Sequence, residues 1–510
     1  CMAYRISGNE KYFIRAWAML ENICSMGDWM PTNHLTPAEM SAVVAVGYDW
    51  LYDALSKQQR EFIEKAVYNN AIYDFLRAYR DQSSPMQNGM YVDMNHSVIC
   101  NSGAFLTAMA FMDIYPEECS RIASEALRGI NVTLYRFAPV GAWFEGPGYW
   151  EYTVQYLSKL ISSAKTALGT DYNISKAQGL SSAQRYMLAM QSDKAIFNYG
   201  DAGENKYLVP EIMYLADLSG DMASLSAFLN MSGGEMNNAE DAALAMLWYT
   251  KPSDDGSLLK DFYFEGEEVA SMRDGWSAEN QTFVGLRAGK LSETHSDLDA
   301  GSFVFDCFGM RWAKDSGSGN YDVNGYWDIS ENGGRWKTLA KRAEAHNTIA
   351  INPTVKNEFP VDYSAKITAF QSGENEAAAI MDLTDAQRDN AVSAKRGFWF
   401  TDNRKSLVIR DEISLKASST LYWFMQTDAD VSVSESGATL TQGGKSVKLE
   451  FVTNAEGAVI SAEEIKPLFG GSVLYNNSKG NRIAIKITAS GDFNITVKLT
   501  PEGVNASSIN

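Results

Sequence analysis

The sequence has few cysteines and no long apolar run, and each shortage excludes a class of protein. Its five cysteines are scattered without a Cys-x-x-Cys pair, which excludes a zinc ribbon and a disulfide framework. We expect most of them to be buried thiols that pack as small apolar side chains. No apolar stretch approaches the ~18–20 residues that a membrane-spanning helix needs. The sequence therefore predicts no membrane span.

Basic residues are also in short supply. Lys and Arg together number 44 against 63 Asp and Glu, which gives a formal net charge of −19. A protein that binds nucleic acid needs a basic surface, so the excess of acidic residues argues against a nucleic-acid partner. An acidic substrate held in a locally basic groove remains compatible with this net charge. Apolar residues make up 45% of the chain and charged residues 21%, which excludes a disordered or fibrous protein. A chain of 510 residues suggests two to four folding units.

Up to about residue 250, apolar residues recur with the helical period. The N-terminal residues Cys1–Ile6 have the pattern of a helix end that stops at Gly8, and we expect that residues upstream of Cys1 are missing. Capping boxes are predicted at Thr36–Glu39 and Ser56–Gln59. Helices are predicted over 10–26, 36–55, 56–79, 97–114, 117–134, 149–168, 181–192, 204–218, 222–230 and 238–249. Short connections between them predict antiparallel hairpins arranged in an arc or toroid.

The polar segment Lys251–Ser257 marks the clearest boundary, and beyond it the apolar period becomes two. Stretches such as Ser302–Phe305 and Arg482–Ile487 are typical of antiparallel strands. The sequence therefore predicts a helical domain over 1–250, a linker over 251–268 and a domain of stacked antiparallel β-sheets over 269–510. The predicted fold class is α+β with separate domains, an incomplete (α/α) toroid followed by a β-sandwich.

Two polar stretches of the helical half could carry chemistry. Asn95 and His96 precede an apolar helix, and Tyr149 lies in an aromatic cluster around a Gly-Pro-Gly turn. Helix capping by Asn95 and aromatic packing by Tyr149 are the purely structural alternatives.

A third group lies in the β half. His295, Asp297 and Asp299 follow one another at a spacing of two, and Asp315 and His346 come later. On an extended segment the first three would face one way. A histidine with carboxylates suits a divalent metal such as zinc, and the structural alternative is that these are ordinary polar residues at the protein surface.

These stretches together resemble the heparinase II/III-type polysaccharide lyases. The resemblance is carried, in chain order, by Asn95–Gly103, Glu145–Trp150, His295–Phe303, Arg311–Asp315 and Arg342–Thr348. It implies an (α/α) toroid followed by stacked sheets, with the active site in the cleft between them. It also implies β-elimination on a uronate-containing polysaccharide, a glycosaminoglycan such as heparin or heparan sulfate, or an alginate-like chain. Such enzymes are typically periplasmic or secreted in bacteria, and several carry a structural metal in the β domain.

The chemistry of β-elimination assigns roles to the candidate residues. Asn95 would neutralise the uronate carboxylate by hydrogen bonding. By resemblance, Tyr149 is the acid that protonates the leaving oxygen and also a candidate for the base, with His96 or His295 as the alternative base. Trp143, Tyr326 and Arg342 are predicted to bind the substrate.

The metal set follows from the resemblance. Many relatives read His-x-His-x-Asp where this chain has His295–Asp299, and Asp297 takes the place of the second, metal-binding histidine. The predicted ligands are Asp297, Asp315 and His346, with zinc as the expected ion, calcium and manganese as alternatives, and loss of the metal as a further alternative. Asp299 is predicted to orient a ligand.

A basic run, Arg335–Arg342, is predicted either to form a basic lip that attracts an acidic sugar or to be a solvated face. Two other functions compete with a lyase. A glycoside hydrolase on a similar toroid would need a carboxylate pair, for which Glu145 and Glu151 are the nearest candidates. A non-catalytic glycan-binding protein would keep the aromatic residues without the chemistry.

Overall fold

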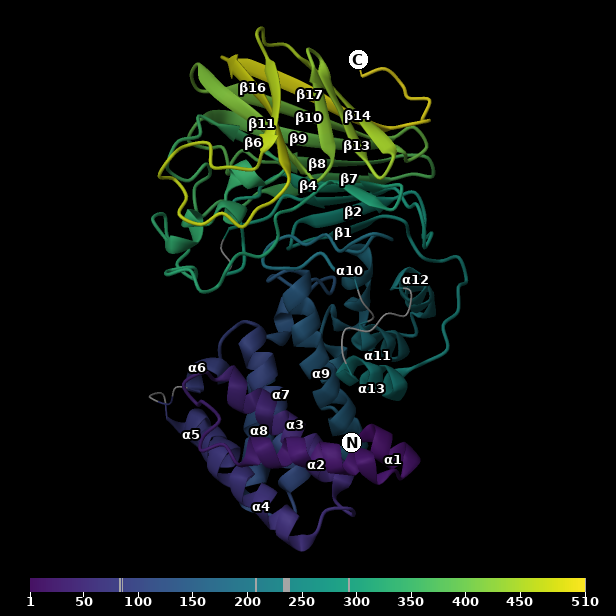
Figure 1. The fold of residues 1–510 in the computed structure, drawn as a ribbon, viewed down its shortest axis with the longest axis vertical. Helices are drawn as coiled ribbons and strands as arrows, with labels where there is room; N and C mark the ends of the chain where they lie inside the picture. Colours follow the sequence, from purple (N-terminus) through teal and green to yellow (C-terminus); the bar gives the residue numbers. More distant parts are fainter. Residues whose placement is uncertain (82–83, 85, 207–208, 233–238, 292–293, 510) are drawn as a thin grey trace.

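Helices fill the first half of the chain and antiparallel sheets the second (Figure 1). The computed structural model describes residues 1–81, 84, 86–206, 209–232, 239–291 and 294–509. Within these ranges, no helix combines the length and the apolar character needed to cross a membrane. The predicted fold class, a helical (α/α) part followed by stacked antiparallel sheets, is confirmed.

The helices of the first half include α7, which packs against α3, α8 and α9. Their bounds are α1 Met2–Ser7, α2 Glu10–Cys24, α3 Leu35–Leu51, α4 Lys57–Val67, α5 Tyr73–Arg80, α6 Gln87–Met90, α7 Asn95–Phe111, α8 Pro116–Ile130, α9 Pro147–Leu168, α10 Gln184–Ala189, α11 Pro210–Ser219, α12 Met222–Ser232 and α13 Ala239–Trp248. Almost every residue of α7 is buried, because α3, α8 and α9 all pack against it. A helix that is apolar on all sides belongs at the centre of a bundle. The polar residues at the start of α7 are therefore held in a rigid part of the molecule.

One predicted capping box is present and the other is wrong. Ser56 accepts a hydrogen bond from the backbone N–H of Gln59, and the Gln59 side chain accepts one from the backbone N–H of Ser56. Helix α3 instead begins at Leu35, and its start has no side-chain cap. The Glu39 carboxylate accepts a hydrogen bond from the Tyr152 hydroxyl of α9. The side chain that would complete the Thr36 box therefore joins two helices.

The second half folds into three antiparallel sheets. The five-stranded sheet has the order β1-β2-β3-β4-β5, with β1 Phe262–Phe264, β2 Val269–Arg273, β3 Phe283–Arg287, β4 Ser302–Cys307 and β5 Met310–Ala313. The eight-stranded sheet has the order β12-β13-β14-β17-β10-β9-β8-β7, with β7 Lys366–Ser372, β8 Ala377–Asp382, β9 Ala391–Thr401, β10 Ser406–Leu415, β12 Asp430–Ser434, β13 Gly437–Gln442, β14 Lys445–Thr453 and β17 Asp492–Pro501. The four-stranded sheet has the order β15-β16-β11-β6, with β6 Ile349–Ile351, β11 Ser419–Thr427, β15 Val459–Glu464 and β16 Asn481–Ala489.

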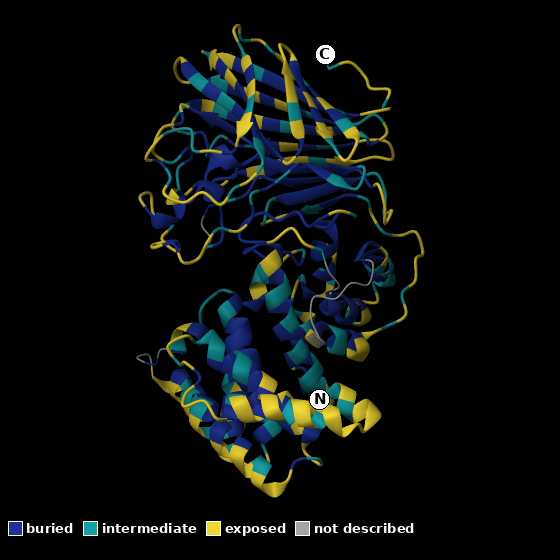
Figure 2. Cartoon of the chain, in the orientation of Figure 1, coloured by how far each residue is buried: buried dark blue, intermediate teal, exposed yellow. Residues whose placement is uncertain are grey.

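The five-stranded sheet is the middle layer of the molecule. Val269 and Phe283 belong to the core of the helical half, whereas their neighbours Ala270 and Val284 belong to the core of the other sheets. Successive side chains of a strand point to opposite faces, so both faces of this sheet are buried. Figure 2 shows β1 to β5 almost entirely in the colour of buried residues. The two halves therefore share a continuous apolar contact.

The predicted linker over 251–268 is partly wrong, because β1 lies inside it and pairs with β2. Buried arginines of the β half then fix the chain that leaves α10. Arg273 donates to the backbone carbonyls of Ala189 and Gln191, at 2.8 and 2.9 Å. Arg311 donates to the carbonyl of Ile196 at 2.7 Å. These bonds place the segment 189–204 of the helical half directly against the β half.

Candidate active site

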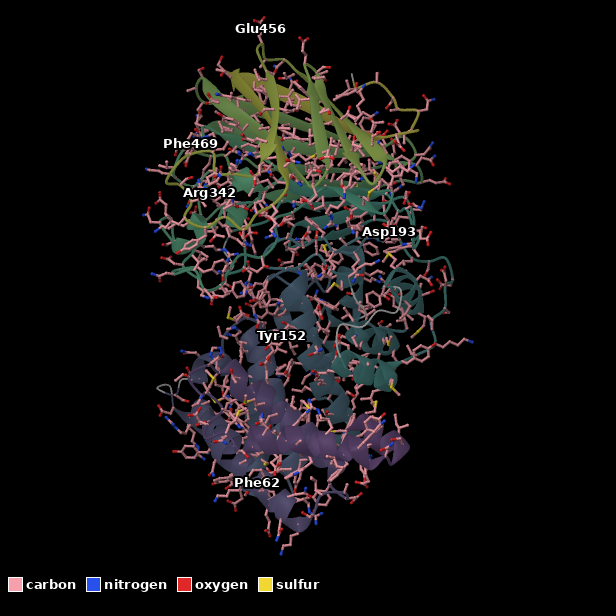
Figure 3. The ribbon with its side chains drawn as sticks, in the orientation of Figure 1. Phe62, Tyr152, Asp193, Arg342, Glu456 and Phe469 are labelled. Atoms are coloured by element: carbon pink, nitrogen blue, oxygen red, sulfur yellow. The ribbon has the colours of Figure 1, made fainter. Side chains whose placement is uncertain are left out.

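Residues from both halves meet where the segment 189–204 lies against the loop between β3 and β4. Asn95 and His96 open α7, Tyr149 lies in the first turn of α9, and His295 lies in the β3–β4 loop. Figure 3 labels Tyr152, about one turn beyond Tyr149, on the part of α9 between the lower helices and the sheets. The structure thus brings together all four predicted catalytic residues, which are far apart in the sequence.

The turn before α9 shapes the site. Gly146 has a φ of +91°, a backbone conformation that residues with a Cβ rarely adopt, and Pro147 follows as the first residue of the helix. A Cβ on Gly146 would also lie 3.3 Å from the carbonyl oxygen of Tyr199. The Glu-Gly-Pro-Gly-Tyr sequence therefore makes a tight turn with Glu145 just before the helix and Tyr149 in its first turn.

Glu145 is the centre of the hydrogen-bond network, and its side chain is fully buried. It accepts hydrogen bonds from the backbone N–H and the side-chain Nδ2 of Asn95, both at 2.8 Å. It also accepts one from Trp143 Nε1 at 3.1 Å, and His295 Nε2 lies 3.4 Å away. A buried carboxylate with this many donors fixes the positions of its partners. Glu145 therefore orients Asn95 and His295 together.

His295 lies between two carboxylates. Its Nδ1 is 2.8 Å from Oδ2 of Asp201, on the side of the ring opposite to Glu145. Burial alone would lower the pKa of His295, but the hydrogen bonds to Asp201 and Glu145 outweigh it, so the pKa is raised above its ordinary value. Its ring also stacks on that of Tyr149, with centroids 3.8 Å apart and planes 24° apart. His295 is therefore favoured as an imidazolium and is a poor proton acceptor.

Tyr149 has the properties of a proton donor. Its hydroxyl lies 2.9 Å from that of Tyr321, which comes from the loop after β5. Burial raises the pKa of Tyr149 to about 12, although the hydrogen bond with Tyr321 lowers it. The phenol is therefore protonated at neutral pH.

His96 has the properties of a proton acceptor. Burial, together with the neighbouring rings of His34 and His295, lowers the pKa of His96 to about 4, although Glu145 acts in the opposite direction. Its Nδ1 lies 2.7 Å from Nε2 of His34, so one ring donates a hydrogen bond to the other. His96 is half-buried and neutral at neutral pH.

Several residues of the site escape prediction from the sequence. His34 is a single histidine 62 positions before His96, and no local pattern links the two. Tyr321 and Trp327 are 41% and 49% exposed, and their rings lie 4.8 Å apart. The Trp327 ring meets that of His295 edge-on, with centroids 5.4 Å apart. A cluster of aromatic residues in a Gly- and Asn-rich loop is the signal that could have pointed to Tyr321 and Trp327.

The three predicted substrate-binding residues are buried and are engaged by other side chains of the protein, so direct contact with a substrate stays a prediction for them. Trp143 is fully buried against Phe137 and Phe144, and its Nε1 donates to Glu145. Tyr326 is also fully buried, and its hydroxyl donates to Asp201 at 2.6 Å. These two rings support the site from within.

Arg342, the third, is 1% exposed, and its guanidinium lies 3.2 Å from Glu344 and 2.8 Å from Glu358. Figure 3 labels it inside the β half. It lines a cavity of about 1040 Å³ whose walls include none of the four candidate catalytic residues. The basic lip predicted for Arg335–Arg342 is wrong, because Arg335 and Lys341 are buried in ion pairs as well.

The three predicted metal ligands lie close together but do not form a metal site. His346 Nδ1 is 3.2 Å from Asp315, and His346 Nε2 is 3.8 Å from Asp297 and has no hydrogen-bond partner within the described residues. Arg335 and Lys341 contact the Asp297 carboxylate at 3.0 and 3.1 Å. Across the described ranges, no group of three or more His, Cys, Asp or Glu is arranged to hold a metal ion. The residues present therefore do not fit a divalent ion.

Asp299 was predicted to orient a metal ligand, and the structure gives it another partner. Its carboxylate pairs with Arg287 of β3 at 2.9 Å and accepts from the Tyr363 hydroxyl at 3.2 Å. Asp299 therefore stabilises the β3–β4 loop and the strand that precedes it.

Comparisons with known proteins cover both halves. Residues 269–494 match the family described as Heparinase II/III-like, C-terminal. The structure of a heparinase III superposes with a TM-score of 0.66 and 15% identity, over 99% of this chain and 75% of the other. The structure of a mutant of the heparan sulfate lyase HepC from Pedobacter heparinus also superposes with a TM-score of 0.66 and 15% identity, over 99% of this chain and 75% of the other. No curated protein matches the sequence.

Proposed function

Because residues 269–494 match the model of the heparinase II/III-like family and the chain shares the fold of a heparinase III over nearly its whole length, we propose that it is a polysaccharide lyase. The proposed reaction is β-elimination on a uronate-containing polysaccharide. The observation that carries the proposal is the meeting of Asn95, His96 and Tyr149 around Glu145 and His295. These groups match the three demands of the reaction.

The first demand is neutralisation of the uronate carboxylate, which makes the proton on C5 acidic. Asn95 supplies this role because its Nδ2 carries two hydrogens and Glu145 engages one of them. Asn95 is fully buried, and a hydrogen bond in a site with little water stabilises developing charge more than one in bulk solvent.

The second demand is a base for the C5 proton. The depressed pKa of His96 supports this role, whereas the raised pKa of His295 does not. If His96 Nδ1 donates to His34, the lone pair of His96 remains on Nε2, on the far side of the ring. With this donor direction, His34 is a positioning residue that fixes the tautomer of the base.

The third demand is an acid for the leaving oxygen. When His96 takes the C5 proton, the electron pair of that bond forms the double bond between C4 and C5, and the C4–O bond breaks. The glycosidic oxygen then takes the phenolic proton of Tyr149, which is present at neutral pH because burial raises the pKa of this group. Both residues regain their starting protonation states by exchange with water.

The exposed aromatic rings beside the site suit a sugar substrate, and the family resemblance narrows the proposed substrate class. Tyr321 and Trp327 expose their rings next to Tyr149 and His295, and exposed rings of this kind bind the faces of sugars. We propose a glycosaminoglycan related to heparan sulfate, or an alginate-like chain, as the substrate. A periplasmic or secreted location in a bacterium is proposed from the family resemblance.

A product assay tests the proposal. Incubation with heparan sulfate, heparin, hyaluronan and alginate should yield unsaturated uronate ends with new ultraviolet absorbance for at least one of them. Tyr149→Phe and Asn95→Ala should each lower turnover by ~10²-fold or more. Saturated reducing ends alone would instead support a hydrolase that uses Glu145 and Glu151. Binding without any cleavage would support a glycan-binding protein.

A further inference from the structure

Lys341 is an unusual lysine because its ammonium group is fully buried at the contact between the two halves. Its Nζ lies 2.8 Å from Oδ1 of Asp201 and 3.1 Å from Oδ1 of Asp297. It also donates to the backbone carbonyls of Gly317 and Gly200, at 2.8 and 3.1 Å. Oxygen atoms from three separate segments of the chain therefore surround one cation.

The backbone is built to form this arrangement. Gly200 and Gly317 have φ values of +69° and +65°, which favour glycine. A Cβ on Gly317 would lie 2.7 Å from Nδ2 of Asn198, and one on Gly200 would lie 2.9 Å from the carbonyl oxygen of His295. Both glycines are therefore required for the close approach that brings their carbonyls to the ammonium group.

The distances suit an ammonium ion and not a metal. The oxygens lie 2.8–3.1 Å from Nζ, which is the range of N–H···O hydrogen bonds. Calcium binds oxygen at ~2.3–2.6 Å, and zinc binds its ligands at ~2.0–2.3 Å. Lys341 and Arg335 also supply two positive charges to the buried carboxylates of Asp201 and Asp297.

We propose that the Lys341 ammonium group takes the place of a structural metal ion in this protein. It joins Gly200 and Asp201 of the helical half to Asp297 and Gly317 of the β half. It also holds Asp201, whose other carboxylate oxygen accepts from His295 Nδ1. Lys341 is thus a positioning residue for His295, and the folded chain needs no divalent ion at this position.

Elemental analysis and thermal unfolding of the whole chain test the proposal. The unmutated protein should contain no stoichiometric zinc, calcium or manganese, and EDTA should leave its Tm unchanged. Lys341→Met keeps much of the side-chain volume but removes the charge, and it should lower Tm by roughly 5–10 °C, because it removes one of the two buried cations that Asp201 and Asp297 share. Lys405→Met is the matched control, because Lys405 pairs with Asp274 at the surface and its loss should change Tm little.

A third variant separates a cation site from a merely structural lysine. Lys341→Ala vacates the space between Asp201 and Asp297, and MnCl₂ should bind to it with about one ion per chain and restore part of the lost Tm. One equivalent of metal in the unmutated protein, removed by EDTA with a fall in Tm, would overturn the proposal. So would a folded Lys341→Ala protein that binds no manganese, or a Lys341→Met protein that melts like the unmutated one. These readouts do not depend on lyase activity, so they remain decisive even if the proposed function is wrong.

Discussion

The pH dependence of turnover offers the sharpest test of His96 as the base. His96 loses its activity as a base when it is protonated, and the pKa of His96 is about 4 instead of the usual value near 6.5. At pH 5.5, a histidine with the usual pKa would be only about 10% neutral, whereas His96 should be almost entirely neutral. We therefore expect kcat/KM at pH 5.5 to lie close to its plateau, with the acidic limb near pH 4.

The basic limb of the same profile should lie outside the usual range. In the proposed reaction Tyr149 donates a proton and so must stay protonated, and burial raises the pKa of Tyr149 to about 12. The plateau of kcat/KM should therefore extend beyond pH 9. The two limbs belong to the free protein when kcat/KM is followed by the absorbance of the unsaturated product.

The stability of the fold limits how far the acidic limb can be followed. The pKa of His96 is lower in the folded chain than in the unfolded chain, so between pH 6.5 and 4 the unfolded chain binds more protons. The stability that His96 contributes is therefore complete above pH 6.5 and is lost as the pH falls through 4, by roughly 3 kcal/mol. Activity recovered on return to pH 7 distinguishes titration of the base from unfolding.

Two outcomes would refute the reasoning. An acidic limb between pH 6 and 7 would mean that the base is a histidine with an ordinary pKa. A His96→Gln protein with near-normal turnover would move the base elsewhere. His34→Gln provides the matched comparison, because it leaves His96 in place and removes only the ring that fixes the tautomer.

Two further predictions concern the exposed ring and a buried acid. Trp327→Ala should raise KM roughly tenfold with little change in kcat. The reason is that the half-exposed ring contributes the same binding free energy in the ground state and in the transition state. A fall in kcat alone would contradict this. Glu211 is fully buried in α11, its carboxyl oxygens have no hydrogen-bond partner within the described residues, and burial raises the pKa of Glu211 to about 8. The free energy of unfolding should therefore fall as the pH rises from 4.5 to 8. Glu211→Gln should remove this pH dependence, so the Tm of the variant should exceed that of the unmutated protein by a margin that grows towards pH 8. Equal slopes of Tm against pH in both proteins would contradict this.

Much of the fold could be predicted from the sequence because local patterns determine it. The predicted helix over 149–168 matches α9, which begins only two residues earlier, and the Ser56–Gln59 box opens α4 as expected. Such features depend on residues three or four positions apart. The box predicted at Thr36 failed because Tyr152, more than a hundred positions away, binds the Glu39 side chain. A local pattern carries no information about such a partner.

In the candidate site, too, local motifs could be predicted from the sequence, whereas contacts between distant residues could not. The turn Glu145–Tyr149 and the dipeptide Asn95-His96 are local motifs, and the structure brings them together. The roles of charged residues were harder to predict, because charge in a sequence does not indicate burial. Arg335, Lys341 and Arg342 form a basic run in the sequence, yet their partners Asp201, Asp297 and Glu358 are distant from them in the sequence. Only the tertiary structure pairs them.

The pairing of these cations has a consequence for catalysis. A buried guanidinium or ammonium that already contacts a carboxylate has little positive potential left for a second anion. Arg335 and Lys341 are engaged by Asp201 and Asp297, so neutralising a substrate carboxylate does not fall to them. In the proposed reaction this task falls instead to Asn95, a neutral donor whose strength does not depend on pH. The buried cations contribute indirectly, because they hold Asp201 in place, Asp201 accepts from His295, and His295 stacks on Tyr149. In a chain with a net charge of −19, the acid, the base and the neutral donor thus work in a site whose strongest charges are already balanced.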